Sequence, residues 1–68
     1  MDRINRIKDV LFAQGKSQTW LAEQLGKSRS TIALMVNNKT QPHLKDLKEI
    51  ARLLDVDISE LLYRTKPA

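Results

Sequence analysis

Apolar residues recur every three or four positions along most of this 68-residue chain, and that spacing limits its possible folds more than any other feature. The spacing is typical of helices that bury one face, whereas half-buried strands alternate apolar and polar residues at every second position. No segment shows a competing alternation, and no internal repeat is present. The sequence therefore predicts an all-α fold in one small domain.

Helix packing must also supply the stability of this domain. A domain of this size buries only about 60% of the surface that its unfolded chain exposes. The chain contains no cysteine and one histidine, so neither a disulfide nor a zinc cluster can reinforce it. Because cysteine nucleophiles and metal-ligand clusters are also missing from the sequence, we expect neither an enzyme nor a protein that needs a metal or cofactor.

Capping residues divide the amino-terminal part of the chain into short helices. Asp2 is expected to cap the first, which Gly15 would close in a left-handed conformation. Ser17 is expected to cap the second, which would end at Gly26. The inward positions are Ile4, Ile7, Val10 and Leu11 in the first helix and Leu21, Ala22 and Leu25 in the second.

A third helix is predicted from Arg29 to about Asn37, with Ser28 as its cap. It follows the second helix after a turn of only Gly26-Lys27. Asn38 then falls where a helix exit needs a left-handed residue, a conformation that asparagine tolerates. The buried side of this helix would consist of Ile32, Met35 and Val36.

Two further helices are expected after Pro42, which keeps the stretch before them extended. The inward residues of the fourth helix would be Leu44, Leu47, Ile50, Ala51 and Leu54. Asp57 and Glu60 form a capping-box start for a short fifth helix. Its apolar residues are Ile58, Leu61 and Leu62. The domain would fill residues 1–63, and residues 64–68 are expected to form a flexible tail.

The positive charge of the chain is concentrated in its middle. The formal net charge is +4 and the sequence pI about 9.8. Residues 15–45 contain five basic residues and one acidic residue, a net +4, whereas residues 46–68 contain four basic and five acidic residues, a net −1. This distribution favours a polyanionic partner on one surface, with an ordinary solvated face as the alternative.

The second and third predicted helices form the pattern of a helix-turn-helix. Two short helices are joined by a tight turn that contains glycine, and the second of them is polar at its front and apolar behind. A helix that enters the major groove of DNA end-on needs donors and acceptors in its first turn and an apolar anchor at its rear. The third helix offers both.

Three segments carry a resemblance to a known family: QTWLAEQLGKSRSTI at residues 18–32, NNKTQP at 37–42, and a tail from Leu47 to Leu62 with the pattern L-x-x-I-A-x-x-L-x-V-x-x-x-x-L-L. With them, the chain resembles a lambda-repressor/Cro-like helix-turn-helix domain of the xenobiotic-response-element (XRE) family. The resemblance covers nearly the whole chain. It implies a five-helix fold, dimeric binding to near-palindromic operators in double-stranded DNA, and transcriptional control, with repression as the expected mode.

The resemblance also implies roles for individual residues. The expected base contacts are Ser28, Arg29, Ser30 and Leu34. The expected phosphate contacts are Ser17, Gln18, Lys27, Asn37, Lys39 and Thr40. Arg29 is the strongest candidate because its forked guanidinium can bond O6 and N7 of guanine together, with a phosphate contact or a solvated arginine as the alternative. Leu34 would meet a thymine methyl group or merely support Ser30.

Several positions depart from the family pattern. Many members carry an ion pair between an arginine of helix one and a glutamate of helix three, where this chain has Leu11 and Val36. Replacing both charges leaves neither unpaired in the interior, so we expect Leu11 and Val36 to touch. Trp20 is expected to lie over neighbouring aliphatic stems, with a contact to a partner protein as the alternative. His43 should have a capping or solvent role.

The remaining expectations concern partners and location. The resemblance places a homodimer contact around Pro42 and Ile58. The alternative function is a protein-interaction module of the same fold, an antitoxin or adaptor that binds through Trp20, Leu34 or the last helix. The sequence has no apolar run of membrane-spanning length and no signal-peptide pattern, so we expect an intracellular, cytoplasmic protein.

Overall fold

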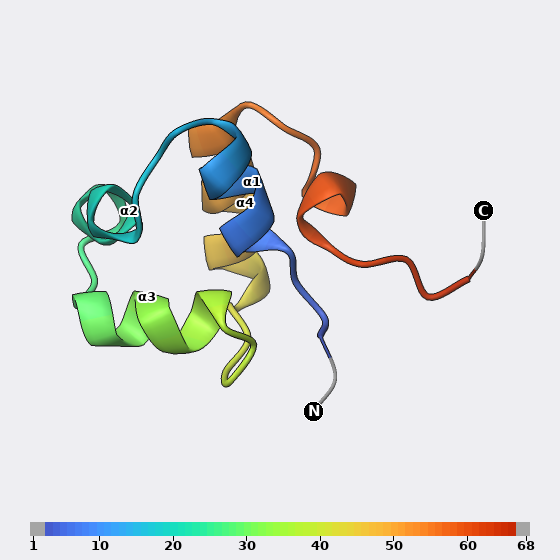
Figure 1. Cartoon of the computed structure of the whole chain (residues 1–68), viewed down its shortest axis with the longest axis horizontal. Coiled ribbons are helices and arrows are strands. Elements are labelled where there is room, and N and C mark those ends of the chain that lie inside the picture. The colour runs from blue at the N-terminus through green and yellow to red at the C-terminus, as the bar shows by residue number, and fades with distance from the viewer. Residues whose placement is uncertain (1–2, 67–68) are drawn as a thin grey trace.

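The computed structural model describes residues 3–66, and this part of the chain is helical, as predicted (Figure 1). The elements are α1 (Ile7–Ala13), α2 (Gln18–Leu25), α3 (Arg29–Val36), α4 (Leu44–Leu54) and a short 3-10 helix, η1 (Ile58–Leu61). The fifth predicted helix is thus a single 3-10 turn, and the other four elements are α-helices. None of the helices within residues 3–66 is both long and apolar enough to cross a membrane.

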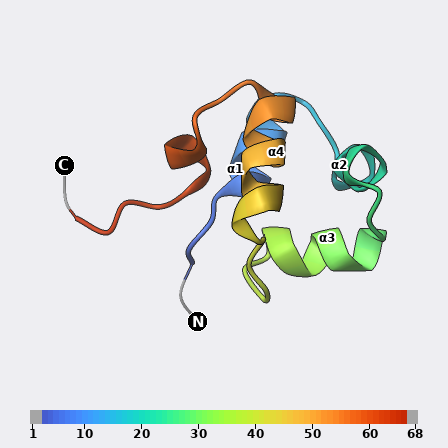
Figure 2. The ribbon, with the colours of Figure 1, turned by 180° about the vertical axis from the view of Figure 1, so that it is seen from behind.

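One buried cluster joins all five elements. α1 and α4 lie against each other at the centre, α2 and α3 lie on one side of them, and η1 lies on the other (Figures 1 and 2). The cluster consists of Ile7, Leu11, Leu21, Ala22, Ile32, Met35, Val36, Leu47, Ile50, Ala51, Leu54 and Leu61. Leu11 and Val36 are each 2% exposed within it, so the two positions that carry charges in many relatives are here part of the apolar core.

The start of α1 differs from the prediction. The helix begins at Ile7 rather than after Asp2, which lies outside the described residues. Asn5 pairs with Leu62 in an isolated antiparallel bridge. Because Ile4 belongs to this extended segment and not to the helix, its side chain is 51% exposed instead of facing inward.

The start of α4 is a second correction. Leu44 was expected to face inward but is 82% exposed. It is the first residue of the helix and lies one turn before Leu47, where the buried residues of α4 begin. The other four predicted inward residues of α4 are buried. His43 stands at the N-cap without a side-chain capping bond and is exposed, so of its two predicted roles the structure supports the solvent one.

Candidate nucleic-acid interface

The helix-turn-helix unit is built by two serine caps and one glycine. Ser17 Oγ accepts a hydrogen bond from the Trp20 N–H at 2.9 Å, and Ser28 Oγ accepts one from the Thr31 N–H at 3.1 Å. Each bond satisfies a backbone donor that the first turn of a helix leaves without a partner. Gly26 has the left-handed conformation that ends α2, with φ at 65°. These predicted caps are confirmed. Together they start α3 directly after the short loop that follows α2.

α3 has one anchored side and one open side. Ile32, Met35 and Val36 are buried, as predicted, whereas Arg29 and Ser30 are exposed. Among residues 3–66, no side chain forms a hydrogen bond or an ion pair with the Arg29 guanidinium. Its five N–H donors are therefore available to an external partner.

Two of the predicted base contacts are less simple. The Ser28 hydroxyl already caps α3 and also donates to Thr31 Oγ1 at 2.9 Å, so its hydrogen-bonding capacity is partly used within the protein. Leu34 is 47% exposed on α3. That exposure is compatible with either of its predicted roles.

The predicted phosphate contacts lie at three places in the fold. Ser17 and Gln18 are at the start of α2, and Asn37, Lys39 and Thr40 are at the exit of α3. The exit loop is closed by the N–H groups of residues 39 and 40, which both donate to the carbonyl of residue 34, at 2.8 and 3.2 Å. Lys39 and Thr40 are exposed.

Lys27, the third place, differs from the other candidates. Its ammonium lies 3.3 Å from a carboxylate oxygen of Asp46 on α4, and both side chains are partly buried. The pair partly offsets the charge that Lys27 could present to a phosphate. Spacing along the sequence could not reveal it, because the partners come from different helices.

Asn5 and Asn38 are central to the geometry of this surface, and the roles of their side chains were not predicted from the sequence. Asn5 is 1% exposed, and its amide donates to the Met35 carbonyl at 3.0 Å and to Gln41 Oε1 at 2.8 Å. Asn38 is left-handed, as predicted, with φ at 60°. Its Oδ1 accepts the backbone N–H groups of Ile4 and Asn5 at 2.8 and 2.9 Å. These bonds attach the exit loop of α3 to the segment before α1.

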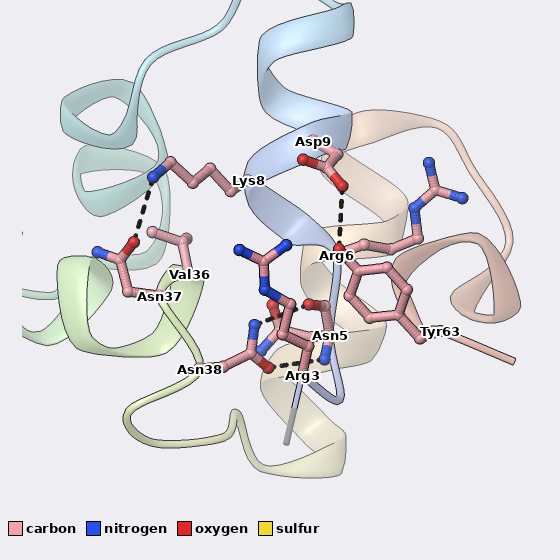
Figure 3. Close-up of a pocket in the computed structure, with 9 residues that line it drawn as sticks. All are labelled: Arg3, Asn5, Arg6, Lys8, Asp9, Val36, Asn37, Asn38 and Tyr63. Atoms are coloured by element: carbon pink, nitrogen blue, oxygen red, sulfur yellow. Dashed lines mark hydrogen bonds between the residues drawn. The ribbon is translucent and has the colours of Figure 1, made fainter. Parts of the chain in front are cut away.

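A polar cleft of about 200 Å³ lies beside this junction (Figure 3). Its lining includes three basic residues that were not among the predicted contacts, namely Arg3, Arg6 and Lys8.

Trp20 lies close to where it was predicted. Its ring is half-buried against the core, and Lys16 Nζ lies 4.5 Å from the ring centroid, which is a cation–π contact.

Two neighbouring ionisable groups on α4 have displaced pKa values. The hydrogen bond from Arg52 lowers the pKa of Glu49, and the same bond raises the pKa of Arg52. Both groups are exposed to solvent, as an ion pair on a helix surface commonly is. In the part of the chain that the structure describes, no three acidic, histidine or cysteine residues are grouped as metal ligands.

A capped pair of helices joined by a left-handed glycine, with the second helix open at its first turn, defines a helix-turn-helix domain of the class used for DNA binding. The helix-turn-helix family model matches residues 7–61, so this chain belongs to that family, the XRE family of lambda-repressor-like domains. A search of curated proteins returned no match.

The chain is also similar to a solved structure. That structure is the crystal structure of an inferred DNA-binding protein from Bacteroides fragilis. The two chains are 47% identical in sequence and superimpose with a TM-score of 0.86. The match covers 88% of this chain and 97% of that one. Fold and family are therefore settled together, whereas the contacts of individual residues stay predictions.

Proposed function

We propose that this protein is a sequence-specific regulator of transcription that inserts α3 into the major groove of double-stranded DNA. The observation that carries the proposal is the division of α3: Arg29 and Ser30 are exposed at its first turn, while Ile32, Met35 and Val36 are buried. An α-helix fits the width of the major groove, where each base pair displays its own donors and acceptors. Such a function would place the protein in the cytoplasm, as expected from the sequence.

In this proposal, different residues contact the base edges and the phosphates. Arg29 bonds guanine through O6 and N7, Ser28 and Ser30 lie beside it, and Leu34 lies against a thymine methyl or supports Ser30. The backbone is held by Ser17, Gln18, Asn37, Lys39 and Thr40, with a weaker contribution from Lys27 because of its ion pair.

The proposed regulator acts as a dimer. One small domain covers about 600 to 1,000 Å² on DNA, which seldom supports tight specific binding. Two copies would occupy half-sites about 34 Å apart in a near-palindromic operator. Pro42 is half-buried and Ile58 is 38% exposed, so both can contribute to a contact between copies. Bound in this way, the dimer would act as a repressor.

One observation favours a second candidate function, a protein-interaction module such as an antitoxin or adaptor. Phe12 is 87% and Leu44 82% exposed, and such side chains occur in docking surfaces. The two candidates differ in their response to salt. A DNA-binding protein loses affinity steeply for mixed-sequence duplex between about 50 and 200 mM salt, because counterions are released on binding. An adaptor would show no salt-sensitive binding to that duplex.

A further inference from the structure

Lys8 lies between two groups of proposed phosphate contacts that are distant in sequence. Ser17 and Gln18 form the first group, at the start of α2, and Lys8 lines a shallow hollow together with them. Asn37 belongs to the second group, at the exit of α3, and Lys8 lines the polar cleft together with it and with Asn38. Lys8 therefore lines both the shallow hollow and the polar cleft.

The Lys8 ammonium is held at the exit of α3. Its Nζ donates to Asn37 Oδ1 at 3.2 Å (Figure 3). Asn37 is itself fixed, because its Nδ2 donates to the Ala33 carbonyl at 2.8 Å. An ammonium has three N–H donors, so this bond leaves two for other acceptors. A phosphate oxygen is one acceptor that forms a strong, charge-assisted hydrogen bond with an ammonium group.

The charges around Lys8 agree with an anionic ligand. In Figure 3 the Arg3 guanidinium is directed toward the side where Lys8 and Val36 lie, whereas the Arg6 guanidinium extends in the opposite direction, away from Lys8. The cleft has one carboxylate in its lining, Asp9, which accepts the Tyr63 hydroxyl at 3.2 Å and lies away from the Lys8 ammonium. Lys16 lies on the other side, in the hollow at the start of α2.

We propose that Lys8, flanked by Arg3 and Lys16, binds a phosphate of the DNA strand that Gln18 and Asn37 contact, so that one basic strip follows that strand. The inference rests on the proposed function and adds to it a phosphate site supplied by α1. A lysine that only tethered Asn37 would contribute to folding without changing how binding responds to salt. That difference makes the two roles separable.

The test measures the affinity for mixed-sequence duplex DNA by fluorescence anisotropy at several salt concentrations, for the wild type, Lys8→Ala, Lys8→Arg and Lys48→Ala. Lys48 is an exposed lysine of α4, so its loss makes the same change in net charge away from the strip. We expect Lys8→Ala to make the log–log salt slope shallower by about 0.9 relative to Lys48→Ala, since one phosphate contact is lost. Lys8→Arg should restore the wild-type slope.

The possible outcomes distinguish the proposed Lys8 phosphate site from the proposed DNA-binding function on which it rests. If Lys8→Ala and Lys48→Ala have the same slope and affinity while the wild type binds with a steep salt dependence, the Lys8 site is wrong and the proposed function stands. If the wild type shows no salt-sensitive binding, the proposed function itself is wrong. Circular dichroism melting of each variant checks that an altered slope does not come from unfolding.

Discussion

Asn38 holds the main chain of Asn5 with both ends of its side-chain amide: Oδ1 accepts the Asn5 N–H at 2.9 Å, and Nδ2 donates to the Asn5 carbonyl at 2.9 Å. These bonds join residues 33 positions apart. Asn38 lies in the left-handed region with φ at 60°, which glycine also reaches without strain, but glycine has no amide to form these bonds. Asparagine supplies the conformation and the amide together.

Substitution of Asn38 separates these two contributions. Asn38→Gly keeps the left-handed conformation and loses the amide bonds, so we expect a loss of about 1 to 3 kcal/mol in the free energy of unfolding. Asn38→Ala also introduces left-handed strain and should cost roughly 1 kcal/mol more. Urea denaturation monitored by circular dichroism measures both. Equal stability of Asn38→Gly and the wild type would show that the amide does not anchor the exit loop.

The helix-turn-helix geometry depends on the caps of α2 and α3. We expect Ser17→Ala and Ser28→Ala each to lower the free energy of unfolding by about 1 kcal/mol, because a backbone N–H loses its acceptor. Ser30→Ala is the matched control, since Ser30 is exposed in the first turn of α3 and is not its cap. The same urea titration applies. If Ser30→Ala were as damaging as Ser28→Ala, the loss would not come from capping.

The apolar pair at Leu11 and Val36 gives a third prediction. Leu11→Arg places an unpaired charge at a position that is 2% exposed and should destabilise the fold by about 3 to 5 kcal/mol. The double variant Leu11→Arg/Val36→Glu should lose about 0.5 to 3 kcal/mol less in the free energy of unfolding than the sum of the two single losses, because the charges can then pair. A double-mutant cycle in urea measures this coupling. Strictly additive losses would mean that the two side chains do not meet.

Features fixed by neighbouring residues were predictable from the sequence. Ser17 and Ser28 cap the helices that follow them, Gly26 ends α2, and the buried side of α3 follows from apolar spacing alone. In each case the interacting groups are at most four residues apart, so the local pattern contains the whole cause. The family resemblance rests on the same local features.

Features that join distant segments were not predictable. The start of α1 was misplaced because its preceding segment is held by Asn38 and by pairing with Leu62, and neither partner is marked by local spacing. Lys27 was predicted as a phosphate contact without its ion pair, because its partner, Asp46, belongs to another helix. The cleft beside Lys8 forms only when α1, the exit of α3 and the residues after η1 come together.

We propose that the open first turn of α3 contacts base edges, and selection from a random pool of DNA duplexes shows whether it does. We expect the wild type to enrich one near-palindromic sequence. Arg29→Ala should relax the preference at one base position in each half-site, whereas Lys39→Ala should weaken binding to all sequences alike, because phosphate contacts carry no sequence information. If Arg29→Ala selects the same sequences as the wild type, Arg29 does not contact a base edge and the proposed role of α3 is wrong.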